Sequence, residues 1–137
     1  MVDNTRITAP IHGKIELAMK SLVNRRGFMN NFVILSDELQ TETTASAYVE
    51  QSMLWAAKEY LTLTLESEEQ ITFVDGASSR LEVFHAKYNE VTEEHLFMQT
   101  ARICGKKVYL LTLGLDNDTA ADNYSKYKTI LSTFTCK

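Results

Sequence analysis

The segment Lys107–Leu115 is apolar on both faces of the strand that its sequence predicts. One face would carry two aliphatic residues and the other three large apolar residues: Val108 and Leu110, then Tyr109, Leu111 and Leu113. A sheet that is covered on one side only alternates more cleanly between apolar and polar residues. We therefore expect a sheet that is covered on both sides, at least at its centre.

Turn residues divide the neighbouring sequence into further strands. Asp75-Gly76, the dipeptide most typical of a tight hairpin, separates a strand over residues 71–74 from a long one over residues 77–88. Cys104-Gly105-Lys106 separates a strand over residues 95–104 from the two-sided one. An earlier strand covers residues 32–35, and residues 14–23 fit either a strand, which we favour, or a helical turn. Short turns between neighbours predict an antiparallel sheet.

Two amphipathic helices flank these strands. Residues 44–61 repeat apolar side chains in steps of three and four, and Thr43 or Thr44 can cap the helix. Its predicted apolar face comprises Ala45, Val49, Met53, Ala56 and Tyr60, widened by Leu54, Ala57 and Leu61. Residues 119–134 keep the same spacing, and Thr119 with Asp122 forms a variant of the capping box. The order of elements predicts an α+β fold, a central antiparallel sheet flanked by helices on both faces (an α/β/α sandwich).

Length and composition fit one domain over residues 1–137, with residues 1–31 as its least determined segment. Hydrophobic residues make up 45% of the chain and charged residues 23%, close to the globular average. The formal net charge is −4, and the basic clusters are two pairs, Arg25-Arg26 and Lys106-Lys107. A nucleic-acid binder displays a basic stripe instead. No apolar run approaches the roughly 20 residues that span a bilayer. We expect neither a nucleic-acid partner nor a transmembrane segment.

Three stretches resemble the PsbP-like superfamily in element order and hydrophobic spacing: NNFVILSDEL, EEQITFVDGASSRLEVFHAKY and KKVYLLTLGLDNDTAADNYSKYKTILSTF. The resemblance covers about residues 32–134. This superfamily includes the photosystem protein PsbP, DcrB-like bacterial lipoproteins, a Ran-binding nuclear import factor and chaperones for type VI secretion effectors. The resemblance implies a sheet sandwiched by helices, in a protein that binds other proteins without a catalytic centre. Members usually begin with a strand, a proline and a tryptophan, whereas no tryptophan closely follows Pro10 here.

Catalytic motifs are absent from the sequence: it has no G-x-S-x-G, no P-loop, no G-x-G-x-x-G and no H-E-x-x-H. If the strands over residues 77–88 and 95–104 pair, His85 falls opposite Phe97 and His95 lies diagonally on the same face. A stable metal site needs three or four ligands. We expect no catalytic residue, no cofactor and no metal.

The two cysteines have a topological reason to meet. Cys104 lies at the turn between the last two strands, and Cys136 follows the last helix, whose end should return near that turn. A disulfide closing a loop of roughly 30 residues would stabilise the fold by about 3–4 kcal/mol. It would also argue for an oxidising compartment. Two free thiols are the alternative.

We therefore predict a non-enzymatic protein-binding or accessory domain. Four strand aromatics could form its binding patch, with core packing as the alternative: Phe84, Tyr88, Phe97 and Tyr109. Two roles stay open. The chain could be the processed part of an exported protein or lipoprotein, in the periplasm or cell envelope. It could instead be a cytosolic chaperone for a secreted effector, acting as a homodimer.

Overall fold

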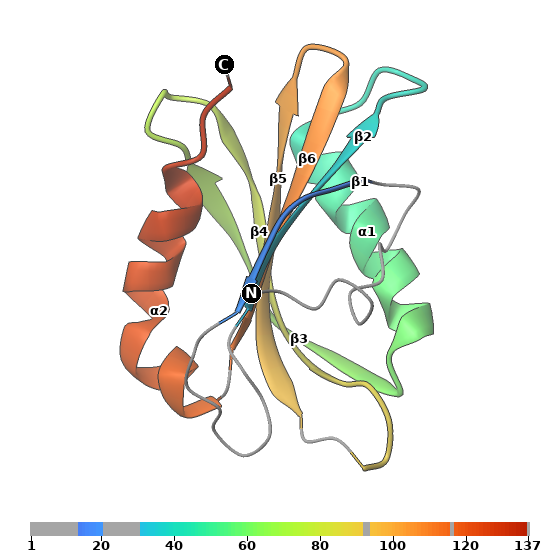
Figure 1. The fold of residues 1–137 in the computed structure, drawn as a ribbon, viewed down its shortest axis with the longest axis vertical. Helices are drawn as coiled ribbons and strands as arrows, with labels where there is room; N and C mark the ends of the chain where they lie inside the picture. The colour runs from blue at the N-terminus through green and yellow to red at the C-terminus, as the bar shows by residue number, and fades with distance from the viewer. Residues whose placement is uncertain (1–13, 21–30, 92–93, 116, 137) are drawn as a thin grey trace.

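The computed structural model describes residues 14–20, 31–91, 94–115 and 117–136. These ranges contain six strands and two helices, which are β1 (Lys14–Lys20), β2 (Asn31–Glu38), α1 (Ala45–Glu59), β3 (Thr62–Thr72), β4 (Ser78–Lys87), β5 (His95–Cys104), β6 (Lys107–Leu115) and α2 (Asn117–Ser132). The strands form one antiparallel sheet in the order β1-β2-β6-β5-β4-β3. Helices α1 and α2 lie on opposite sides of this sheet (Figure 1).

Glycine forms both predicted hairpin turns. Gly76 has a φ of +97° and donates its backbone N–H to the carbonyl of Phe73 at 2.9 Å, between β3 and β4. Gly105 has a φ of +66° between β5 and β6. A side chain is strained at positive φ, which explains glycine at these two positions. The turns predicted at Asp75-Gly76 and Cys104-Gly105-Lys106 are confirmed.

The α2 side of the sheet holds the larger apolar core. Leu131 of α2 is fully buried there, and Tyr124 and Tyr127 pack against the same cluster. The sheet contributes alternate residues of its strands, among them Ile34, Leu81, Val83, Leu96, Met98, Leu111, Leu113 and Leu115, and Ile71 and Phe73 join them at the β3 end. The predicted apolar face of Tyr124, Tyr127, Leu131 and Phe134 is confirmed, because all four contact this core, although α2 ends at Ser132 and Phe134 follows it.

The α1 side holds a smaller core, formed by Val33, Leu35, Val49, Ala101, Val108 and Leu110. Helix α1 buries Val49, Ser52 and Ala56. The predicted widening of its apolar face is wrong, since Leu54 and Leu61 are 69% and 53% exposed. The α+β class and the antiparallel sheet are confirmed. Among the described residues, each side of the sheet carries a single helix. The structure therefore supports the predicted α/β/α sandwich only as one sheet between two helices.

Element boundaries show where local signals were misinterpreted. The Thr44 cap is confirmed, because its Oγ1 accepts from the N–H of Ala47 at 3.1 Å. Helix α2 begins at Asn117, so Thr119 lies inside it and the predicted Thr119–Asp122 capping box is wrong. A strand is confirmed over Lys14–Lys20, and residues 21–23 of that prediction lie outside the described residues. Strand β3 begins at Thr62, nine residues before the predicted start at Ile71.

Candidate functional site

A row of polar side chains crosses the α1 side of the sheet. Glu82, Gln99 and Thr112 are direct cross-strand neighbours on β4, β5 and β6. The amide Nε2 of Gln99 donates to Oγ1 of Thr112 at 3.0 Å. Glu82 and Gln99 are buried, and so is Ser52 on the helix that packs over β4 and β5. The centre of this interface is therefore polar, although it is shielded from solvent.

Several buried atoms of this interface lack a hydrogen-bond partner among the described residues. They are Oε2 of Glu82, Oε1 of Gln99 and Oγ of Ser52. Buried polar atoms are paired in most proteins, because an unmade bond costs desolvation energy. Burial raises the pKa of Glu82, nearby Glu68 raises it further, and Arg80 opposes the shift. The α1 side of the sheet therefore contains buried polar atoms whose hydrogen bonds are incomplete.

Aromatic side chains gather where α1 ends. The rings of Phe84 and Phe97 stack with centroids 5.3 Å apart. Tyr60, which caps α1, lies 5.6 Å from Phe97 and meets Tyr88 edge-on at 5.8 Å. Gly114 lies beside Phe97 on β6, and a Cβ there would come within 3.0 Å of the Phe97 ring. We call Tyr60, Phe84, Tyr88 and Phe97 the aromatic end.

Exposed apolar residues surround the aromatic end. Tyr88 is 56% exposed, Leu61 follows Tyr60 directly, and Leu65 pairs with Phe84 across β3 and β4 while remaining 43% exposed. Burial raises the pKa of Tyr60 to about 12, with smaller contributions from Tyr88 and Glu59. Its hydroxyl therefore stays protonated at neutral pH. A supported aromatic cluster with an exposed apolar margin is the kind of surface that other proteins bind.

The predicted aromatic patch is partly wrong. Phe84, Tyr88 and Phe97 do come together, but Phe84 is buried and acts as support. Tyr109 lies on the opposite side of the sheet, against Phe134 at a centroid distance of 5.2 Å. Tyr60 belongs to the cluster and was interpreted only as part of the helix face. Its place at the end of α1, just before β3, was the signal that could have identified it.

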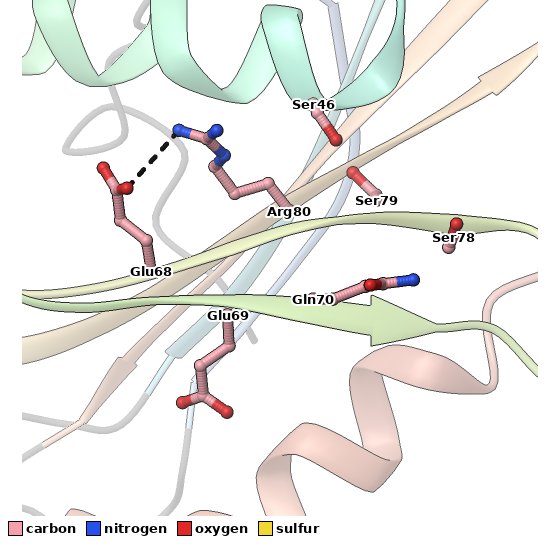
Figure 2. Close-up of a pocket in the computed structure, with 7 residues that line it drawn as sticks. All are labelled: Ser46, Glu68, Glu69, Gln70, Ser78, Ser79 and Arg80. Carbon is pink, nitrogen blue, oxygen red and sulfur yellow. Dashed lines mark ion pairs between the residues drawn. The ribbon is translucent and has the colours of Figure 1, made fainter.

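A polar hollow of about 320 Å³ lies at the other end of β3, beneath the first turns of α1 (Figure 2). Its lining residues are Ser46, Glu68, Glu69, Gln70, Ser78, Ser79 and Arg80. Nη1 of Arg80 lies 3.6 Å from a carboxylate oxygen of Glu68, 3.6 Å from one of Glu82 and 3.7 Å from one of Glu50. One guanidinium thus lies among three carboxylates.

Glu69 points away from this hollow, toward α2 (Figure 2). Its carboxylate accepts from the hydroxyl of Tyr124 and, at 2.9 Å, from Nζ of Lys128. These two hydrogen bonds lower the pKa of Glu69, while burial and the Glu69 carboxylate raise the pKa of Tyr124. Neighbouring glutamates of β3 therefore act on opposite sides of the sheet.

The predicted histidine pair is not formed. The register places His85 opposite Leu96, so His95 lies on the other face of the sheet. His85 lies between two carboxylates instead, with Nε2 3.5 Å from Glu66 and Nδ1 3.8 Å from Glu94. Within the described residues, no group of three or more potential ligands could hold a metal ion.

Cys104 and Cys136 form a disulfide in the structure, with Cα atoms 5.6 Å apart. The bond connects the β5–β6 turn to the segment that follows α2 and closes a sequence separation of 32 residues. It fixes the end of the helix that covers the larger core.

Among the comparisons with known proteins, only solved structures match, and they identify the fold of this chain. No family model and no curated protein matches the sequence. Among solved structures, PA94 of Pseudomonas aeruginosa, a protein of unknown function described as a candidate regulator, superimposes with a TM-score of 0.70 at 16% identity, over 93% of this chain and 85% of PA94. CyanoP, the PsbP protein of the cyanobacterium Synechocystis, superimposes with a TM-score of 0.57 at 14% identity, over 88% of this chain and 81% of CyanoP.

The chain has a PsbP-like fold. In this PsbP-like domain the aromatic end and the polar hollow lie along the same edge strand, β3, with Leu65 near one and Gln70 at the other. Neither described helix is long and apolar enough to cross a membrane.

Proposed function

We propose that this PsbP-like domain is a non-enzymatic accessory domain that binds another protein through the aromatic end. The observation that carries the proposal is the exposure of Leu61, Leu65 and Tyr88 around packed aromatic rings. Interface cores are enriched in tyrosine, phenylalanine and other aromatics, which contribute much of the binding energy. The chemistry of this surface therefore favours a protein partner.

The support beneath this surface favours binding as well. Phe84 and Phe97 stack under it, and Gly114 leaves room for the Phe97 ring. Side chains that are already packed lose little freedom when a partner arrives, so less of the interaction energy is lost to ordering. The likeness to CyanoP agrees with an accessory role, as does the sequence resemblance to a superfamily of binding proteins.

We further propose that the domain functions in an oxidising compartment, the periplasm or cell envelope, as the processed part of an exported protein. The Cys104–Cys136 disulfide supports this placement, because cytosolic reductants keep thiols reduced. A cytosolic effector chaperone would contain two free thiols. Intact-mass analysis after thiol alkylation, under non-reducing conditions and on protein from its native source, separates the two. Two alkylated cysteines would contradict the exported role.

Site-specific photocrosslinking tests the binding surface. p-Benzoylphenylalanine at Leu61 should crosslink one discrete partner in the native cell, while the same probe at Lys126 on the exposed surface of α2 should not. Purified partner should then bind Tyr88→Ala and Leu65→Ala at least about tenfold more weakly than the parent domain. Equal crosslinking at both probe positions, or unchanged affinity of both variants, would contradict the proposal.

A further inference from the structure

The charges around the polar hollow are unbalanced. The three Arg80–carboxylate separations of 3.6–3.7 Å exceed the roughly 2.7–2.9 Å of a charge-assisted hydrogen bond. Arg80 therefore neutralises its neighbours by proximity, without a tight pair. Even with Glu82 protonated, Glu50 and Glu68 outnumber the single guanidinium. The site retains an excess of negative charge that attracts a second cation.

The neutral groups of the hollow are also acceptors. Ser46, Ser78 and Ser79 supply hydroxyls, and Gln70 supplies an amide oxygen. Ser79 is only 3% exposed, and its Oγ has no hydrogen-bond partner in the part of the chain that is described. In Figure 2, Ser79 is drawn between β4 and α1, close to Ser46 in this view. An ammonium or guanidinium, which only donates, can bond to hydroxyl, amide and carboxylate oxygens such as these.

The hollow opens beside a strand edge. β3 is the last strand of the sheet order and pairs with β4 alone among the described strands. A bulge interrupts the register between Leu65 and Ser67, after which pairing with β4 continues to Thr72. An edge strand presents N–H and C=O groups that an extended peptide can pair with. The stretch Ser67–Thr72 offers this edge next to the acidic hollow.

We propose that the hollow receives the lysine or arginine side chain of an extended peptide that adds to the edge of β3. This inference rests on the protein-binding function proposed above and specifies the partner segment. Leu65 and Gln70 are five residues apart on β3, roughly 17 Å of extended chain. One partner strand therefore spans both sites, with an apolar residue at the aromatic end and a basic residue at the hollow.

Designed peptides test this recognition directly. The probe is a nine-residue peptide of alternating valine and threonine with one lysine, added to ¹⁵N-labelled protein. The backbone amide signals of Glu68, Gln70 and Thr72 should shift on titration. A peptide with norleucine in place of lysine should bind about tenfold more weakly, because a hydrogen bond to a charged group contributes on that order. A lysine peptide with N-methylated backbone amides should also bind more weakly, because it cannot pair with the strand.

Two variants of the protein locate the basic residue. Glu50→Gln and Glu68→Gln should each weaken binding of the lysine peptide several-fold. Glu66→Gln is the matched control, since its side chain is 53% exposed against 48% for Glu68 and its carboxylate lies 3.5 Å from His85 instead of beside Arg80. All three changes are at exposed positions, and amide spectra of the free variants verify that each is folded.

Equal binding of the lysine and norleucine peptides, or full affinity in both hollow variants, would overturn the inference. If spermidine shifts the same amides as strongly as the lysine peptide, the hollow is a free-cation site and strand addition is wrong. A partner captured at Leu61 that binds the Glu50→Gln/Glu68→Gln double variant with full affinity would also reject this inference, while the proposed function stands. Failure to capture any partner at Leu61 would contradict the proposed function, and the peptide titrations would still decide this inference.

Discussion

The two sides of the sheet bury their helices in different ways. On the α2 side, one apolar cluster extends from Ile34 to Leu131. At its margin, Nδ1 of His85 lacks a hydrogen-bond partner among the described residues, whereas Arg102 is paired. Arg102 binds Asp75 through two contacts of 2.8 and 2.5 Å and lies over the Phe73 ring. On the α1 side, a smaller apolar core gives way to a polar row with unpaired atoms.

This difference suggests that stability and binding are assigned to different sides. A large continuous apolar core contributes most of the folding energy. Unpaired buried groups reduce stability, and proteins tolerate such features mainly at functional sites. The hollow and the aromatic end both lie on the α1 side, along β3. We therefore expect mutations on the two sides to change the free energy of unfolding by different amounts and with different pH dependence.

Truncating the α2-side core should have the largest effect. Leu111→Ala removes a fully buried side chain and should lower the free energy of unfolding by about 3–5 kcal/mol. Leu54→Ala, on the exposed surface of α1, should change it by less than about 0.5 kcal/mol. Urea denaturation of both variants measures this. Similar losses in the two would contradict the contribution of the buried Leu111 side chain to the α2-side core.

Breaking the disulfide should have the next largest effect. The Cys104→Ala/Cys136→Ala double variant should lose about 3–4 kcal/mol, because the bond restricts the unfolded chain over a separation of 32 residues. Chemical denaturation of the oxidised protein, the reduced protein and the variant measures the loss. The reduced protein and the variant should agree. Unchanged stability in both would contradict a bond that fixes the end of α2.

Glu69→Gln should destabilise the α2 side by about 1 kcal/mol at pH 7, because it weakens a hydrogen-bonded ion pair at a partly exposed position. Hydrogen bonds from Tyr124 and Lys128 lower the pKa of Glu69. The stabilisation is therefore complete above the unfolded pKa and is lost as pH falls through the lowered value. The difference between wild type and variant should shrink below about pH 4.5. A constant difference down to pH 3 would contradict this linkage.

Glu82→Gln should give the smallest change in the free energy of unfolding. Its pH dependence should be opposite to that of Glu69→Gln. Burial raises the pKa of Glu82, so its contribution is most favourable below pH 4.5 and is lost as pH rises through the raised value. The variant should equal or slightly exceed wild type in stability at pH 7, and this advantage should vanish at pH 4. A larger stability advantage of the variant at pH 4 than at pH 7 would contradict the raised pKa of Glu82.

Much of the sheet could be predicted because its signals are local. The boundaries of β5 and β6 were predicted from apolar segments on either side of a glycine turn. β3 was mostly missed, since Glu66, Glu68 and Glu69 are unusual in a strand and only its pairing with β4 specifies it. Propensity describes a strand poorly when one edge and much of one face are exposed.

The candidate site depended on register, which the sequence does not determine. His85 was predicted opposite Phe97, whereas Phe84 occupies that position. A slip of one residue exchanges the two faces of a strand. The same uncertainty between neighbouring strands put Tyr109 in the patch, although it faces α2. The hollow was not predicted, because its residues come from α1, β3 and β4 and meet only in the folded chain.

The central claim is that the α1 side and the β3 edge bind a partner while the α2 side maintains the fold. Hydrogen exchange with and without the partner captured at Leu61 tests this most directly. We predict slower exchange over residues 61–72 and around Tyr88 in the complex, with α2 unchanged. Protection over α2 with unchanged exchange in β3 would contradict the account.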